Sequence, residues 1–151
     1  MKKYEFTLEK VRDFKSQILN REKNLLLGLR MERNRLEADE QGLKDLFEQL
    51  NDEMHEEFCQ GMCVSRIRLF EYRKNGIREE RRSLGDKMTV LDASIERQQR
   101  RVAAVKQEVS GLDKLEEKQR EDYIRQMLKE QEEIIAEFVS AQLISGKASG
   151  E

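Results

Sequence analysis

The apolar residues between positions 84 and 112 recur at alternating steps of four and three. This spacing keeps one apolar side chain per turn on the same face of a helix, and it is typical of a coiled-coil seam. Gln98 is the polar member of the series, and the same register runs back to Phe70. The apolar members are Phe70, Ile77, Leu84, Met88, Leu91, Ile95, Val102, Val105, Val109 and Leu112.

The first half of the chain carries its own heptad pattern. One heptad position holds Leu29, Leu36, Leu43 and Leu50, and the other holds Val11, Ile18, Leu25 and Leu46. Glu32 and Asp39 interrupt the second group. Two helices with apolar seams bury them on each other when a turn joins them. The pattern therefore predicts an all-α fold: an antiparallel two-helix coiled-coil hairpin with helices over residues 5–57 and 66–143.

Two glycine-containing sites compete for the turn, residues 60–65 and the dipeptide Asn75-Gly76. The seam register passes through Asn75-Gly76 without a slip, and Ser65 suits the N-cap of a following helix. Charge separates the two sites further. Residues 37–57 contain nine acidic side chains and one lysine, whereas residues 66–82 contain seven basic and three acidic ones. A turn over residues 58–65 brings these opposite charges together, while a turn at Asn75 would align bases with bases.

The composition agrees with long exposed helices. The chain has 151 residues, 40% of them charged, and it lacks proline, which helix interiors exclude. The net charge of −2 predicts no general attraction to DNA or anionic lipid. The beginning of the chain does not resemble a signal peptide, and no apolar run reaches the length of a membrane span. We therefore expect a soluble, cytoplasmic protein.

The second predicted helix is longer than the first. With the turn near Gly61, residues pair when their numbers add up to about 123, so Phe6 lies near Glu117. Residues 119–143 then have no partner from the first helix over about 37 Å. Their apolar stripe predicts a binding surface, and self-association or fraying is the alternative. The stripe consists of Tyr123, Met127, Ile134, Phe138 and Val139, and residues 145–151 have the composition of a disordered tail.

Candidate chemistry is sparse. His55, Cys59 and Cys63 follow one another at steps of four, which could place three ligands on one helical stripe. Zinc takes four ligands, and no second pair is present, so we expect free thiols in a reducing compartment and no metal or other cofactor. One histidine offers no nucleophile pair, and adjacent carboxylates such as Glu132 and Glu133 are typical of solvated helices. We therefore predict no enzymatic activity.

The basic residues from Arg66 to Arg82, followed by the leucine seam, superficially resemble a basic-region zipper. Such a region lies as a free helix in the major groove of DNA. Here it contains Gly76 and three acids, and an acidic helix is available to cover it. Nucleic-acid binding is therefore the lower-ranked alternative.

Several motifs together resemble the FliJ family, the small soluble components of the bacterial flagellar export apparatus. They are Phe6-x-Leu8-x-x-Val11, a glycine-centred turn after about sixty residues, Leu112-Asp-Lys-Leu115-Glu-Glu-Lys118, Tyr123 and Glu130-Gln131. The resemblance covers nearly the whole chain. The sequence departs from the family pattern at Arg12, where a leucine is frequent, and at Glu132, Ile135 and Ala136.

The resemblance implies a non-enzymatic adaptor of flagellar type III protein export at the cytoplasmic face of the inner membrane. It implies that the terminal end enters the ring of the export ATPase FliI, that a surface nearer the turn binds the export gate FlhA, and that the export chaperones FlgN and FliT bind as well. A coiled-coil adaptor outside flagella, including the equivalent stalk of a virulence secretion system, is the alternative. The residues assigned to ring binding are Phe6, Leu8, Tyr123, Met127, Ile134 and Phe138, and those assigned to gate binding are Leu46, Phe47, Leu50, Phe70 and Tyr72. For Leu46, Leu50 and Phe70, a purely structural role in the seam is the alternative.

Overall fold

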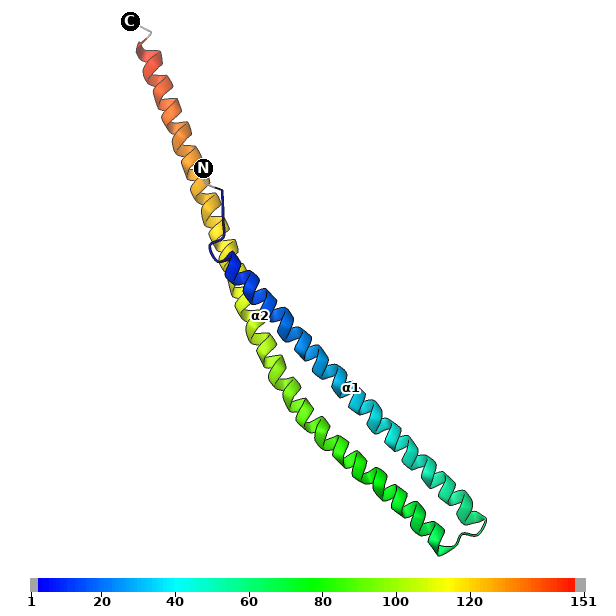
Figure 1. Ribbon diagram of the computed structural model, residues 1–151. Helices are drawn as coiled ribbons and strands as arrows, with labels where there is room; N and C mark the ends of the chain where they lie inside the picture. The colour runs from blue at the N-terminus through cyan, green and yellow to red at the C-terminus, as the bar shows by residue number, and fades with distance from the viewer. Residues whose placement is uncertain (1–2, 149–151) are drawn as a thin grey trace. The chain divides into compact units, whose positions relative to one another are not determined.

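The computed structural model describes residues 3–148, which form two long helices and no strand (Figure 1). Helix α1 spans Glu9–Cys59 and helix α2 spans Val64–Ala148. They run antiparallel on either side of one turn, which confirms the all-α hairpin. The chain divides into two compact units: Leu19–Ala103, which contains the turn, and a second unit built from the segments on either side of it.

The two helix termini farthest from the turn differ from the sequence prediction. α1 begins at Glu9 rather than at residue 5, because the chain first makes a tight turn in which the Glu9 N–H donates to the Phe6 carbonyl (3.3 Å). α2 continues to Ala148, so residues 145–148 of the expected disordered tail are helical. Ser145 supports this end by donating its hydroxyl to the carbonyl of Ala141 (2.6 Å). Residues 149–151 of that expected tail lie outside the described part of the chain.

The turn lies at residues 60–63, inside the expected range. Gly61 adopts φ 94°, a left-handed conformation that glycine takes without strain, and its N–H donates to the Phe58 carbonyl (3.2 Å). α2 then starts at Val64, two residues earlier than a helix capped by Ser65 would start. The Cys63 carbonyl accepts the N–H groups of Arg66 (3.1 Å) and Ile67 (3.2 Å), so Cys63 and not Ser65 is the N-cap. The alternative turn at residues 75–76 lies within α2.

The seam of α2 follows the predicted register. Every apolar member of the series from Phe70 to Leu112 is buried or half-buried, with Phe70 only 2% exposed. Gln98 lies in the same seam at 7% exposure. Its side-chain amide donates to the main-chain carbonyl of Glu22 (3.0 Å) and also bonds the Glu22 carboxylate. The polar member of the series is therefore a satisfied polar layer that matches one position on α2 to one on α1.

The prediction of the α1 seam is correct at one of its two heptad positions. The Leu29, Leu36, Leu43 and Leu50 positions lie in it, and Leu50 is buried. The other predicted position is wrong by one residue, because Leu19 and Leu26 are buried in place of their neighbours Ile18 and Leu25. Of the predicted group, Val11, Leu25 and Leu46 are 44%, 53% and 45% exposed, and Ile18 is half-buried.

Charge pairs across the hairpin explain the shifted register. In the observed register the seam positions after Leu26 hold Arg33 and Glu40. Arg33 Nε lies 2.9 Å from the carboxylate of Asp92, and Glu40 lies 3.5 Å from the guanidinium of Arg81. The predicted register would put the acids Glu32 and Asp39 there instead. A charge at the edge of a seam is tolerated when an opposite charge on the partner helix meets it.

Candidate protein-binding surfaces

The end of the hairpin at the turn contains an apolar core. Leu50, Phe70 and Ile77 are buried together, and Leu43, Phe47, Met54 and Met62 pack against them. Two of the residues expected to bind the export gate, Leu50 and Phe70, are thus 7% and 2% exposed and hold the two helices together. Phe47 is half-buried beneath two cations, with Lys74 Nζ at 5.5 Å and the Arg78 guanidinium at 5.2 Å from its ring centre.

The remaining two gate candidates are open to solvent. Tyr72 is 78% exposed and Leu46 is 45% exposed. The structure adds two residues that heptad reasoning missed, Phe58 at 63% and Val64 at 65% exposure. They flank the turn and belong to neither seam, so an apolar residue beside a turn glycine is the signal that could have found them.

Electrostatics at the turn join the two helices. Arg66 makes a two-pronged ion pair with Glu57, at 3.0 and 2.8 Å. This hydrogen bonding lowers the pKa of Glu57 and raises that of Arg66. The pair realises the expected contact between the acidic end of α1 and the basic start of α2.

The basic segment is largely occupied within the protein. Arg66 pairs with Glu57, Arg81 with Glu40, and Lys74 with Glu71 at 3.3 Å. Side chains held against carboxylates and aromatic rings are not free to neutralise phosphates, so these contacts disfavour the zipper-like interpretation of the segment.

The two cysteines at the turn are exposed free thiols. Cys59 Sγ lies 3.9 Å from Nε2 of His55, and Cys63 Sγ lies 3.1 Å from the Ser65 hydroxyl. The Ser65 hydrogen bond, with the N–H of Arg66, lowers the pKa of Cys63. Within residues 3–148 the histidine, cysteine and acidic side chains form no group of three that could hold a metal ion.

The start of the chain packs against α2. Phe6 is 6% exposed, and the Arg12 guanidinium lies 5.5 Å from its ring centre while also pairing with Glu116. The Tyr4 hydroxyl donates to the Glu116 carbonyl (3.1 Å), and the Tyr4 ring lies 5.5 Å from that of Tyr123. Phe6, one of the six residues expected to bind the ATPase ring, is thus buried in the fold.

This packing shortens the expected unpaired segment. Leu8, Tyr123 and Met127 are half-buried, whereas every residue from 128 to 146 is exposed. The unpaired part of α2 therefore begins after Met127 and not at residue 119, because the non-helical residues before Glu9 reach further along α2 than a helix alone would.

We refer to residues 128–146 as the C-terminal segment. Its apolar side chains include Ile134, Ile135 and Phe138, which are 63%, 61% and 62% exposed, and Leu143, which is 65% exposed. The same segment carries one base, Lys129, and the acids Glu130, Glu132, Glu133 and Glu137. An apolar face of this extent on a helix with an acidic rim is typical of a protein-binding surface.

A comparison with protein-family models matches residues 4–146 to the model described as Flagellar FliJ protein. The chain belongs to the FliJ family. It is therefore a component of flagellar protein export, and the family is a non-enzymatic one. The match confirms the resemblance drawn from the motifs. Comparisons with curated proteins and with solved structures gave no match. Among residues 3–148, neither helix contains an apolar stretch suited to crossing a membrane.

Proposed function

We propose that this FliJ protein is an adaptor of the flagellar type III export apparatus, working at the cytoplasmic face of the inner membrane. In this proposal the C-terminal segment binds the ring of the export ATPase FliI. The turn end binds the export gate FlhA, and the export chaperones FlgN and FliT bind the same protein. The observation that supports it most is the exposed apolar face of residues 128–146 in a member of an export family.

Binding through the C-terminal segment has a clear driving force. Burying a large aliphatic or aromatic side chain contributes roughly 1.5–3 kcal/mol before entropy costs. Ile134 and Phe138 lie one turn apart, so a single apolar site on a partner can take both. The acidic rim favours a partner surface that carries basic residues around that site.

The gate surface rests on the exposed residues of the turn end. Tyr72, Phe58 and Val64 offer aromatic and aliphatic area to a partner. The buried pair Leu50 and Phe70 supports this surface by fixing the helices beneath it. We therefore expect substitutions of Tyr72 to weaken gate binding without unfolding the hairpin.

The experiment compares two double variants in a pull-down with the purified ATPase FliI. Ile134→Asp with Phe138→Asp is expected to abolish binding, because two charges would enter the apolar site. Leu27→Asp with Met31→Asp is the matched control. These residues have the same spacing of four on α1, and they are 57% and 64% exposed. The control is expected to bind like wild type.

Circular dichroism melts of both variants test whether a loss of binding comes from a folding defect. All four positions are exposed, so both melting temperatures are expected to stay within a few degrees of wild type. Binding by the Ile134/Phe138 variant at wild-type strength would remove the C-terminal segment from the proposal. Lost binding with a collapsed melt would assign these residues to the fold instead.

A further inference from the structure

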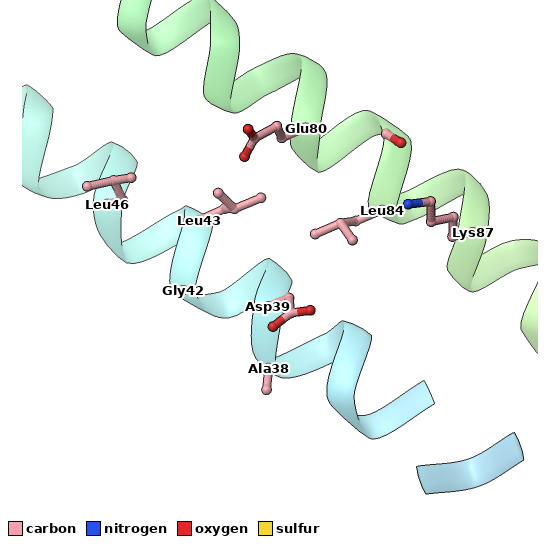
Figure 2. A pocket seen from close by; sticks show the side chains of 9 residues that line it. Ala38, Asp39, Gly42, Leu43, Leu46, Glu80, Leu84 and Lys87 are labelled. Atoms are coloured by element: carbon pink, nitrogen blue, oxygen red, sulfur yellow. The ribbon is translucent and has the colours of Figure 1, made fainter. Parts of the chain in front are cut away.

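A groove runs along one flank of the hairpin within the Leu19–Ala103 unit. Its first part has a volume of about 610 Å³ and lies between α1 residues 38–46 and α2 residues 80–87. Figure 2 shows Leu43 and Leu84 pointing toward each other from the two helices, with Asp39, Glu80 and Lys87 around them. A second hollow of about 530 Å³ is lined by Leu36, Val90 and Leu91. Lys87 borders both hollows, which places them side by side along the hairpin, and together they make up the groove.

The two flanks of the hairpin differ in chemistry. On the groove flank, the α1 residues directly before Leu26, Arg33, Glu40 and Phe47 are Leu25, Glu32, Asp39 and Leu46, and α2 contributes Val90 at 67% exposure. On the other flank, the α1 residues directly after Glu22, Leu29, Leu36 and Leu43 are Lys23, Arg30, Glu37 and Lys44, all of them exposed. A two-helix coiled coil that needs only solvent on both sides would place charge on both. The groove flank instead mixes exposed apolar side chains with acids, which fits a third helix that carries both leucines and bases.

We propose that this groove binds an amphipathic helix of a partner protein, with basic residues on its rim, as the third helix of a local three-helix bundle. The groove spans residues 32–46 of α1, which corresponds to about 21 Å or four helical turns. Leucine-type side chains spaced by three and four would contact Leu43, Leu46 and Leu84, in the manner of helix-in-groove recognition.

The charge of the groove lining indicates which kind of helix can bind there. Four acids line the groove, Glu32, Asp39, Glu80 and Asp86, against two bases, Arg35 and Lys87. A second copy of this chain could offer its C-terminal segment, which has an apolar face of suitable length. That segment carries four acids and one lysine (Glu130, Glu132, Glu133, Glu137 and Lys129). Acids would then meet acids, so a basic helix of another protein is favoured.

Gly42 gives a variant that fills the groove without strain. It lines the groove beside Leu43, and a Cβ atom added there would meet no atom within 4 Å. Gly42→Gln therefore places a side chain in the groove and raises helix propensity. Gly85→Gln is the matched control, because Gly85 is also helical and open but does not line the groove. Both variants are expected to melt at or above the wild-type temperature.

The assay measures fluorescence anisotropy of labelled peptides titrated with the full chain. The probe is a synthetic amphipathic helix of about 18 residues, which spans the groove with one turn to spare, with leucines at steps of three and four and lysines on the rim. A second peptide replaces the lysines by glutamates, and a third is residues 128–146 of this chain.

The lysine-rimmed peptide is expected to bind wild type and Gly85→Gln equally, and Gly42→Gln at least about tenfold more weakly, a loss of about 1.4 kcal/mol. The glutamate-rimmed peptide and residues 128–146 are expected to bind weakly. Failure of the lysine-rimmed peptide to bind wild type, or equal binding to both glycine variants, would overturn the groove as a docking site. Preferential binding of residues 128–146 would replace the basic partner by a second copy of the chain. The assay contains no ATPase, so neither result bears on the proposed function.

Discussion

Leu25 and Leu26 are neighbours in α1, but one is exposed and the other is buried. Substituting each of them therefore tests the observed register directly. Leu26 lies in the seam at 8% exposure, whereas Leu25 is 53% exposed. The perturbation is truncation of each to alanine, one at a time. The chemical change is identical and the positions are adjacent, so the difference between the two variants reports burial alone.

The expected magnitudes follow from that burial. Core leucine-to-alanine substitutions cost about 2–5 kcal/mol. In a seam between only two helices the space left behind opens to water, so Leu26→Ala is expected near the lower end, at about 2–3 kcal/mol. Leu25→Ala loses roughly half a leucine's contact area and gains the higher helix propensity of alanine, for a net cost below about 1 kcal/mol.

Urea denaturation followed by circular dichroism at the helix band measures both values. With a slope of about 2 kcal/mol per molar urea, Leu26→Ala should unfold about 1 M earlier than wild type. Leu25→Ala should unfold within about 0.5 M of it. Equal midpoints would contradict the assignment of the seam, and a larger loss for Leu25→Ala would restore the register predicted from the leucine spacing.

The ion pair at the turn makes part of the stability depend on pH. Arg66 lowers the folded-state pKa of Glu57. The stabilisation of the fold by this ion pair is therefore complete above the ordinary carboxylate pKa of about 4.3, and it is lost as the pH falls through the lowered pKa. Glu57→Gln should thus lower the urea midpoint at pH 7, and its deficit relative to wild type should shrink as the pH falls below about 4.3; a deficit that does not shrink would refute this origin. Phe70→Ala should cost about 3–5 kcal/mol by its near-complete burial, whereas Tyr72→Ala, at 78% exposure, should change the midpoint little; similar losses would show that the turn end is packed differently. A metal chelator should leave the thermal melt unchanged, and a large drop in melting temperature would reveal a metal held by the cysteines of the turn.

The α2 seam could be predicted from sequence because the spacing of its apolar residues is compatible with a single heptad register. From Leu84 to Leu112 the alternating steps of four and three admit a single polar member, Gln98, and the structure satisfies it through Glu22. The position of the turn was predictable for a similar reason. Opposite charges on the two sides of Gly61 matched only one way of folding the chain back.

The α1 register was harder, because two series one residue apart both contain leucines. Ile18 and Leu25 compete with Leu19 and Leu26, and local spacing does not separate them. The choice depends on Arg33, whose partner Asp92 lies 59 positions further along the chain. Contacts between residues so distant in sequence leave no trace in local periodicity.

The candidate sites were predictable as regions rather than as residues. Heptad reasoning placed an unpaired helix at the end of the chain, and Ile134 and Phe138 are indeed exposed there. It could not tell that Phe6 would be buried, since the first residues contact α2 through pairs far apart in sequence, such as the rings of Tyr4 and Tyr123. It assigned both Leu50 and Tyr72 to gate binding, with a seam role as the alternative for Leu50, and the structure shows that Leu50 is core and Tyr72 is surface.

The most direct test of the adaptor proposal is a photo-crosslink in flagellated cells, with a benzophenone amino acid placed at Phe138 or at Met31. The two side chains are 62% and 64% exposed, so neither has an advantage of accessibility. We predict that the Phe138 probe forms a covalent product with the export ATPase on irradiation and that the Met31 probe does not. A product with the ATPase from Met31 and none from Phe138 would contradict the proposal that the C-terminal segment enters the ring.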